Sequence, residues 1–255
     1  VIELNDDRVH DIKIVVKDAN NNTSVLEFKI KKGLIIEKGF IGDSSNYYQQ
    51  KEFHPGFVNI FEEEDIQLML PPSTLYDSVF FSYAKKKTIA PDAFSDVHSV
   101  LSGLVPAETA FTLKLKPNKI IDTNVADKIL MKRTWKGKTD LVKAEKENDW
   151  YVAKFRAFGD FELILDDIPP VIGGFADNSN LSKSRSIIFR PTDNSDEIKS
   201  FKAMLDGKWL RFANDKGRSF IYIFDEKCQP GKHELKITVE DLAGNVAEKV
   251  LHFTR

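Results

Sequence analysis

One segment occurs twice in this chain, once near each end. Residues 10–22 read His-Asp-Ile-Lys-Ile-Val-Val-Lys-Asp-Ala-Asn-Asn-Asn, and residues 233–245 read His-Glu-Leu-Lys-Ile-Thr-Val-Glu-Asp-Leu-Ala-Gly-Asn. Six of the 13 aligned positions are identical. In both copies apolar and polar side chains alternate, which is the period of a half-buried strand. A second strand-like run follows each copy, Thr23–Ile30 and Val246–Thr254. The repeat therefore predicts two β-hairpins and a chain built from sheets.

The turn of each predicted hairpin is rich in Asp, Asn and Gly. These turns are Asp18–Asn22 and Asp241–Asn245. Asn and Gly tolerate left-handed backbone conformations and an Asp side chain binds nearby amides, so turn capping accounts for these residues. The same carboxylate and amide oxygens also suit calcium, although neither turn has the 12-residue ligand spacing with a closing Glu. Capping and calcium binding are both open from the sequence.

The rest of the chain also favours strands over helices. Short apolar or alternating runs lie between turn signals, at the spacing typical of a sandwich or barrel. No window carries a helical apolar stripe beyond a turn or two. The predicted strands are Leu34–Ile36, Gly56–Phe61, Ile66–Leu70, Val79–Tyr83, Phe111–Leu115, Lys128–Arg133, Trp150–Phe155, Phe161–Leu165, Ser186–Arg190, Ile198–Leu205, Lys208–Phe212, Phe220–Phe224, His233–Glu240 and Val246–Phe253.

The segment Asp166-Asp167-Ile168-Pro169-Pro170 is the clearest domain boundary, because paired prolines cannot enter a central ladder. We therefore predict an all-β fold of tandem β-sandwich modules, the last of them immunoglobulin-like. The expected domains are residues 1–30, the terminal β-hairpin of a truncated immunoglobulin-like module; residues 31–166, a middle β-sandwich; and residues 167–255, the immunoglobulin-like module. A lone hairpin is marginal in water, so residues 1–30 are expected to be the tail of a module whose front is missing, or a hairpin docked on its neighbour.

Charge and cysteine content exclude several classes of protein. The chain has 37 Lys and Arg against 39 Asp and Glu, a net charge of -2, which argues against a nucleic-acid binder. No apolar run reaches the roughly 18 residues of a membrane span. The single cysteine, Cys228, excludes an internal disulfide and a cysteine-based zinc cluster. The chain begins at Val1 without a signal peptide, so we expect a processed protein or an excised piece of a longer one.

A search for reactive groups predicts no catalytic, cofactor-binding or metal-binding residue and no cofactor. None of the histidines pairs with another at metal-ligand spacing. Cys228 lies in a turn-like stretch, residues 226–230, without a nucleophile signature, so an inert thiol is expected. The histidines are His10, His54, His98, His233 and His252. His10 and His233 occupy equivalent positions of the repeat, which favours a shared structural role.

Three tryptophans are the candidate contacts to a glycan or a partner protein. Trp135, Trp150 and Trp209 lie near predicted hairpin turns. Exposed tryptophan rings stack on sugar rings, and packing in the core or against a hairpin is the alternative. The pair Tyr47-Tyr48 has the same two interpretations.

Several segments together resemble a known family. They are Asp193-Asn194-Ser195-Asp196-Glu197-Ile198, Leu205-Asp206-Gly207-Lys208-Trp209-Leu210, Gly231-Lys232-His233 and Asp241-Leu242-Ala243-Gly244-Asn245. This series resembles the C-terminal immunoglobulin-like module of lysostaphin-like (LytM-type) zinc metallopeptidases from Bacteroidota. Ala157-Phe158-Gly159-Asp160-Phe161 leading into Asp167-Ile168-Pro169-Pro170 is similar to their domain junction, and His10–Phe28 looks like the end of the module before it.

In that family the catalytic domain precedes these modules, binds zinc through His-x-x-x-Asp and His-x-His segments, and cuts peptidoglycan cross-links. Neither segment occurs in this sequence. The resemblance therefore implies a non-catalytic accessory region of an exported protein of the periplasm or cell envelope, which positions or regulates an upstream zinc endopeptidase or binds cell wall or a partner protein.

Two alternatives accompany this hypothesis. One is an adhesin or surface stalk built from the same modules, whose exposed sheet edges add strands to a partner. The other is a hydrolase in which carboxylate pairs such as Asp166/Asp167 or Asp193/Asp196 act as acid and base. Two close carboxylates with raised pKa values in a cleft would favour the hydrolase.

Overall fold

The computed structural model describes residue 6, residues 8–31 and residues 51–255. In these ranges the regular elements are β-strands apart from one short 3-10 helix, η1 (Ala126–Lys128), which confirms the all-β prediction. None of the helical structure described there is long and apolar enough to cross a membrane. The chain divides into two compact units, Val1–Ser44 and Ser45–Arg255. The predicted strand Leu34–Ile36 and the pair Tyr47-Tyr48 lie outside the described residues.

The first copy of the repeat is an antiparallel hairpin. Strands β1 (Val9–Lys17) and β2 (Thr23–Lys31) pair along their whole length, from Val9 opposite Lys31 to Lys17 opposite Thr23. Asn21 adopts a positive φ of 62° in the turn, a conformation that Asn tolerates better than most residues. The assignment of this hairpin to a truncated module stays a prediction.

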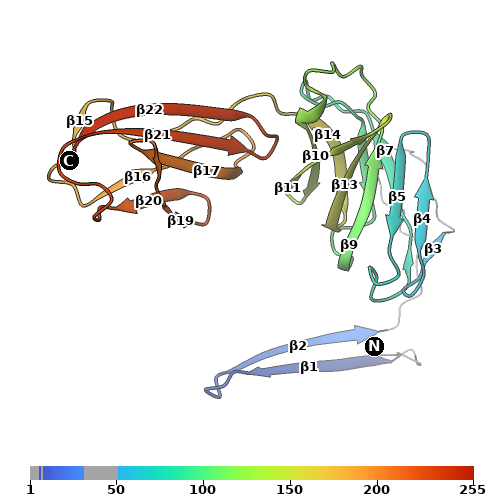
Figure 1. Cartoon of the computed structure of the whole chain (residues 1–255). Coiled ribbons are helices and arrows are strands. Elements are labelled where there is room, and N and C mark those ends of the chain that lie inside the picture. The colour runs from blue at the N-terminus through green and yellow to red at the C-terminus, as the bar shows by residue number, and fades with distance from the viewer. Residues whose placement is uncertain (1–5, 7, 32–50) are drawn as a thin grey trace. The chain divides into compact units, whose positions relative to one another are not determined.

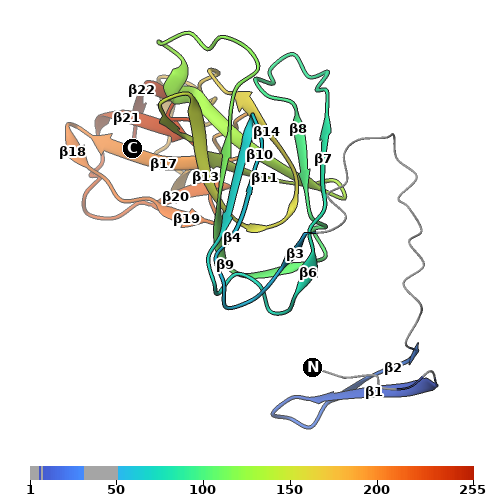
Figure 2. The same cartoon turned by 90° about the vertical axis from the view of Figure 1, so that its right-hand side faces the viewer.

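Two five-stranded sheets enclose a common core in the region that follows, and a two-stranded ribbon, β3–β6, accompanies them (Figures 1 and 2). One sheet has the order β11-β10-β14-β8-β7, and the other has the order β12-β13-β9-β5-β4. The strands are β3 (Glu52–Phe53), β4 (Asn59–Glu62), β5 (Ile66–Leu70), β6 (Val79–Phe80), β7 (Tyr83–Lys86), β8 (Val97–Val100), β9 (Pro106–Leu115), β10 (Ile129–Trp135), β11 (Lys138–Lys143), β12 (Glu145–Glu147), β13 (Trp150–Ala157) and β14 (Gly159–Leu165).

Alternation along the strands builds this core. In β5 the side chains of Ile66, Leu68 and Leu70 are buried while those between them are less so, because successive side chains point to opposite faces of a sheet. Aromatic rings fill the centre, where Phe111 stacks on Phe158 with ring centroids 4.6 Å apart. The sequence pattern therefore marks the face that the sandwich buries.

The predicted strand Val79–Tyr83 is wrong in one respect, because it is divided between β6 and β7. β6 pairs with β3, whereas β7 begins at Tyr83 and pairs with β8. Between them the buried ring of Phe81 stacks on Phe53, with centroids 4.5 Å apart, and its main-chain N–H donates to the Lys51 carbonyl. The chain thus leaves one sheet and enters another within a single, mostly apolar segment.

Two further predicted strands each lose three residues at one end, whereas the other described ones differ from the prediction only by residues added or by one residue lost at an end. Gly56–Phe61 begins only at Asn59, because Gly56 has a φ of +81° in the preceding turn. Lys208–Phe212 is a strand only over Lys208–Trp209.

The C-terminal region has a five-stranded sheet, β15-β22-β21-β17-β18, and a three-stranded sheet, β16-β20-β19 (Figure 1). All neighbouring strands are antiparallel except β15 and β22, which are parallel. The strands are β15 (Ser179–Asn180), β16 (Ser186–Phe189), β17 (Ile198–Leu205), β18 (Lys208–Trp209), β19 (Ala213–Asp215), β20 (Ser219–Ile223), β21 (Lys232–Asp241) and β22 (Val246–Thr254).

Residues with positive φ angles form the turns of two hairpins in this region. Asp206 and Gly207, with φ of 49° and 76°, connect β17 to β18 as the Asp-Gly pair predicts. The three residues 216–218 connect β19 to β20, with φ of 49° at Lys216 and 75° at Gly217. The second copy of the repeat is the last hairpin, β21–β22, whose strands pair from Lys232 opposite Thr254 onward.

Buried hydrophobic residues form two clusters, one on each side of the predicted boundary Asp166–Pro170. The first cluster runs from Phe53 to Leu163 in sequence, and the second runs from Ile172 to Phe253. The chain between them adopts no strand from Asp166 to Pro170. Each cluster has its own pair of facing sheets, which is the arrangement of two β-sandwiches in tandem.

One histidine lies inside the first sandwich. His98 in β8 is fully buried, and its Nδ1 lies 2.9 Å from the hydroxyl of Tyr83. Burial lowers the pKa of His98 from its ordinary value of 6.5 to about 4. The carboxylates of Asp65 and Asp96 oppose this shift, and the Lys85 ammonium reinforces it. His98 is therefore neutral at physiological pH.

This depressed pKa predicts acid sensitivity. The unfolded chain binds the proton near pH 6.5 and the folded chain only near pH 4, so stability falls as the pH drops through that window, by roughly 3 kcal/mol in all. Replacing His98 by Gln is expected to flatten this part of the stability–pH curve, measured by urea unfolding from pH 7.5 to pH 4. The exposed His54→Gln variant is the control. An unchanged slope in the His98 variant would contradict the assignment.

Candidate functional site

The two repeated turns share two of their three hydrogen bonds to the aspartate, those from the main-chain N–H and the side-chain amide of the closing asparagine. In the first, the Asp18 carboxylate accepts the main-chain N–H groups of Asn20 and Asn22, each at 2.8 Å, and the side-chain amide of Asn22 at 2.7 Å. In the second, the carboxylate of Asp241 accepts the N–H groups of Gly244 and Asn245 at 2.7 Å and the Asn245 amide at 2.8 Å. The predicted turn-capping role is thereby confirmed for both turns.

The second turn also joins the two sandwiches. The Asn245 amide donates to the main-chain carbonyl of Asp166 at 2.8 Å, across 79 residues of sequence. Lys128, at the end of η1, and Lys143, at the end of β11, donate to the carbonyls of Gly244 and Ala243 at 2.7 Å. We call these three hydrogen bonds the junction contacts. They fasten the tip of the last hairpin to the end of the preceding sandwich.

Three carboxylates meet beside the junction contacts: Asp166, Asp193 and Asp241, which we call the carboxylate triad. One oxygen from each lies within 4.8 Å of the other two. Asp166 and Asp241 are only 2% and 0% exposed, and Asp193 is half-buried. The residues come from the boundary segment, the loop before β17 and the end of β21, so three distant parts of the sequence form one site.

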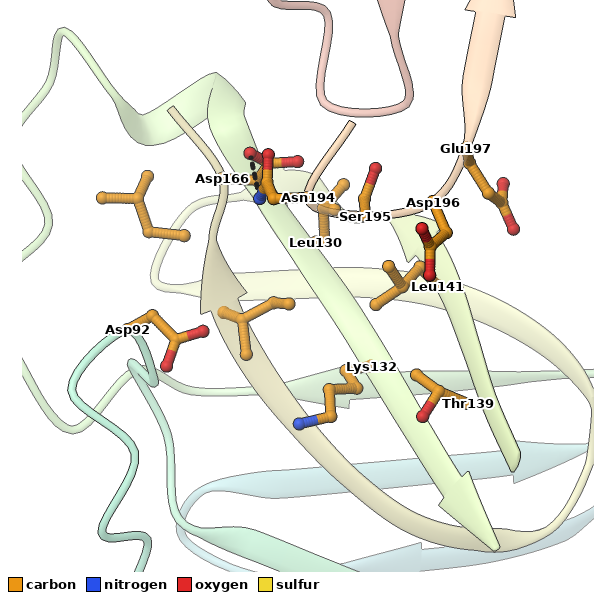
Figure 3. A pocket seen from close by; sticks show the side chains of 12 residues that line it. Asp92, Leu130, Lys132, Thr139, Leu141, Asp166, Asn194, Ser195, Asp196 and Glu197 are labelled. Atoms are coloured by element: carbon orange, nitrogen blue, oxygen red, sulfur yellow. Dashed lines mark hydrogen bonds between the residues drawn. The ribbon is translucent and has the colours of Figure 1, made fainter. Parts of the chain in front are cut away.

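Each member of the triad is held in place by local hydrogen bonds. One oxygen of Asp166 accepts the side-chain amide of Asn194 at 3.0 Å, the bond drawn in Figure 3, and the N–H of Ile168 at 3.4 Å. One oxygen of Asp193 accepts the N–H and hydroxyl of Ser195. The other oxygens, Oδ2 of Asp166 and Oδ1 of Asp193, are buried without a hydrogen-bond partner.

The electrostatics of Asp166 reflect this setting. Burial raises the pKa of its carboxyl above the ordinary range, because the charged form loses hydration. The hydrogen bond from Asn194 opposes this, and the negative charges of Asp193 and Asp241 raise the pKa further. Asp166 is thus a buried carboxyl crowded by like charges.

A pocket of about 470 Å³ opens next to the triad. Figure 3 shows Asp166 and Asn194 side by side, with Asp196 and Glu197 further along the same loop and Lys132 on β10. The structure does not keep the carboxylate pairs proposed from the sequence. Asp166 is close to Asp193 and Asp241, whereas its sequence neighbour Asp167 is exposed.

The three predicted tryptophans lie in three different sheets, so they do not form one aromatic platform. Trp135 ends β10 half-buried, with its ring over Gly103, where an added Cβ would come within 2.4 Å of the indole. Trp150 begins β13 half-buried, with the Lys116 ammonium 5.9 Å from its ring centre. Trp209 is 63% exposed and lines a groove of about 310 Å³.

Each histidine of the repeat lies next to a carboxylate, and Cys228 is buried. Nε2 of His10 lies 2.8 Å from the carboxylate of Asp6, and Nδ1 of its repeat equivalent His233 lies 2.7 Å from the carboxylate of Asp206. Cys228 is buried, which raises the pKa of its thiol and favours the unreactive protonated form.

Residues 50–166 match the family model of the Zu5-like domain. The match covers most of the first sandwich and ends at Asp166, the first residue of the predicted boundary. None of the curated proteins matches the sequence significantly.

Solved structures similar to this chain include fibronectin(III)-like modules of Clostridium thermocellum CbhA, with 12% identity, a TM-score of 0.28, and coverage of 68% of this chain and 93% of theirs. SGBP-B of the mixed-linkage glucan utilization locus of Bacteroides ovatus, in complex with a mixed-linkage heptasaccharide, gives 9% identity, a TM-score of 0.23, and coverage of 97% of this chain and 54% of that chain. The extracellular domain of a hybrid two-component system from B. thetaiotaomicron gives 13% identity, a TM-score of 0.25, and coverage of 94% and 36%. TM-scores this low carry no information on function.

The sequence did not indicate the triad. Asp166 and Asp193 are 27 positions apart in the chain, and Asp241 is a further 48 positions on. The sequence marks two of the three positions as special, since Asp241 belongs to the repeated turn and Asp166 to the proline-rich boundary. In the structure the repeated turn contacts this boundary through the Asn245–Asp166 hydrogen bond.

The junction contacts predict a difference between the two copies of the repeat. Replacing Asn245 by Ala removes a buried hydrogen bond to Asp166 and one within the turn, and is expected to destabilise residues 45–255 by about 1–3 kcal/mol. The equivalent Asn22→Ala change is expected to leave this unit unaffected. Urea unfolding followed by tryptophan fluorescence reports on residues 45–255 alone, because all three tryptophans lie there. Equal effects of the two variants would contradict the role of the junction.

Proposed function

We propose that this chain is a non-catalytic accessory region of an exported cell-envelope protein, in which sandwich modules position or regulate a peptidoglycan-cleaving zinc endopeptidase that precedes them. The observation that carries the proposal is the repeated hairpin. Its two copies share their sequence pattern and their turn hydrogen bonds, and the second copy fastens one module to another. A unit of this kind is suited to building an array of defined geometry.

The face pattern of the first hairpin supports its origin in such a module. Ile14, Val16 and Phe28 correspond to Ile237, Val239 and Leu251 of the second copy. The second set is buried, with exposures of at most 1%, whereas the first set is 45%, 62% and 41% exposed. Each exposed side chain thus occupies a position that packs against an opposing sheet in a complete module. The first hairpin has the form of a closing hairpin of another module.

The hydrolase alternative is less well supported. Acid–base cleavage places the scissile bond between two carboxyls that both reach the substrate. Asp241 is fully buried with both oxygens hydrogen-bonded, and Asp166 is 2% exposed. The triad therefore leaves no space for a sugar or peptide between its members.

The residues encoded upstream of Val1 test the peptidase context. His-x-x-x-Asp and His-x-His segments in a preceding domain are expected, and their presence with measurable cleavage of peptidoglycan by the whole protein would support the proposal. Further copies of the hairpin repeat alone would instead favour the adhesin or surface stalk.

Wall binding is a separate arm of the proposal, and Trp209 is its best contact. Its ring is exposed beside the cationic side chains of Lys199 and Arg211 in one groove. Aromatic rings contribute about 1 kcal/mol or more when they stack on a ligand. Trp209→Ala is therefore expected to weaken retention on purified peptidoglycan about fivefold or more, measured by co-sedimentation. Tyr76→Ala, at a ring of similar exposure, is the control. No retention of the unmodified chain would discard the wall-binding arm.

A further inference from the structure

We propose that the carboxylate triad of Asp166, Asp193 and Asp241 binds one Ca²⁺ ion at the junction between the two sandwiches. This inference goes beyond the accessory role, and it stands or falls on metal binding by the chain alone. A carboxylate offers about four lone-pair positions, and the turn and loop hydrogen bonds use them unevenly.

Each of the three carboxylates has a position that no hydrogen bond uses. Oδ2 of Asp166 and Oδ1 of Asp193 accept no hydrogen bond, although both atoms are buried. Asp241 Oδ2 accepts only the Asn245 amide, which leaves a lone pair on that oxygen as well. One carboxylate oxygen of each residue lies within 4.8 Å of one oxygen of each of the other two, so three carboxylates, two of them with an unpartnered buried oxygen, meet in a small volume.

An unpartnered, buried carboxylate oxygen is costly, because it has lost its hydration without a replacement. Repulsion among the three negative charges adds to this cost. The lysines at the junction do not supply the missing donors, since the ammonium groups of Lys128 and Lys143 are directed to the carbonyls of Gly244 and Ala243. A cation placed among the three oxygens removes both penalties at once.

The donor set selects the ion. Three carboxylates with no imidazole or thiolate are hard oxygen ligands, which suit Ca²⁺ and Mg²⁺ rather than zinc or copper. Ca²⁺ accepts irregular coordination, whereas Mg²⁺ demands a near-ideal octahedron and gives up its water reluctantly. Three carboxylates that meet within 4.8 Å, each held by turn or loop hydrogen bonds, therefore favour Ca²⁺.

The site also agrees with the role of the Asp241 turn. Capping uses the two turn N–H groups and the Asn245 amide, and still leaves one lone pair directed away from these donors. Among the described residues, the exposed Asp18 of the first copy belongs to no group of three possible metal ligands. Capping is common to both turns, and we assign ion binding to the second alone.

Calcium binding is tested on the full chain after treatment with a chelator and dialysis. We expect one ion per chain by calorimetry, with a Kd on the order of 10⁻⁴–10⁻³ M. At 10 mM CaCl₂ the melting temperature of residues 45–255, followed by tryptophan fluorescence, is expected to rise by about 3–10 °C. MgCl₂ at the same concentration is expected to give a smaller rise.

Asp166→Asn separates an ion site from a purely structural role. Without calcium this variant is expected to be at least as stable as the unmodified chain, because one of three crowded negative charges is removed. With calcium it is expected to gain little, so the calcium-induced shift falls below about 1 °C. Asp193→Asn is expected to behave in the same way, and Asp167→Asn, at the exposed neighbouring carboxylate, is expected to keep the full shift.

Three outcomes would overturn the proposal. One is a chelated chain that is folded by circular dichroism and shows neither calcium heat nor a melting shift. Another is an undiminished calcium shift in Asp166→Asn and Asp193→Asn, which would place the ion elsewhere. The third is a shift of equal size in choline chloride of matched ionic strength, which would mean general screening of charge.

Discussion

A hydrogen bond from a turn amide to a main-chain carbonyl links the end of the first sandwich to the tip of the last hairpin. Asn245 closes its own turn against Asp241 and at the same time satisfies the carbonyl of Asp166, where the first sandwich ends. Buried main-chain polar groups must be paired, so the end of one module and the tip of the next become parts of one polar network. Lys128, Lys143 and the carboxylate triad lie around this contact.

Much of the fold could be predicted because its determinants are local. Alternation over Ile66–Leu70 and Ile198–Leu205 gave the strand bounds that the structure has. The Asp206-Gly207 pair specified a hairpin through its backbone preferences. The repeated turn was predicted with its capping residue, since an Asp followed by small and amide residues carries its own hydrogen-bond donors.

The rest could not be predicted, because it is decided by distant parts of the chain. β3 has two residues and β8 has four, too short for a pattern, and they exist because neighbouring strands supply hydrogen-bond partners. The bend at Phe81 depends on packing against Phe53. Trp209 is exposed whereas Trp135 and Trp150 are half-buried, and this difference depends on how the sheets pack. The triad likewise needed three segments to meet.

Position 244 illustrates how assembly restricts a turn. The equivalent residue of the first copy is Asn21, which adopts the left-handed backbone with a side chain in open surroundings. Gly244, at a φ of 92°, lies where an added Cβ would come 3.0 Å from the ammonium of Lys143. The backbone at position 244 disfavours any side chain, and the Lys143 ammonium, which binds the Ala243 carbonyl, would have to shift to admit one. The second copy thus has glycine at the point where its turn contacts the preceding sandwich.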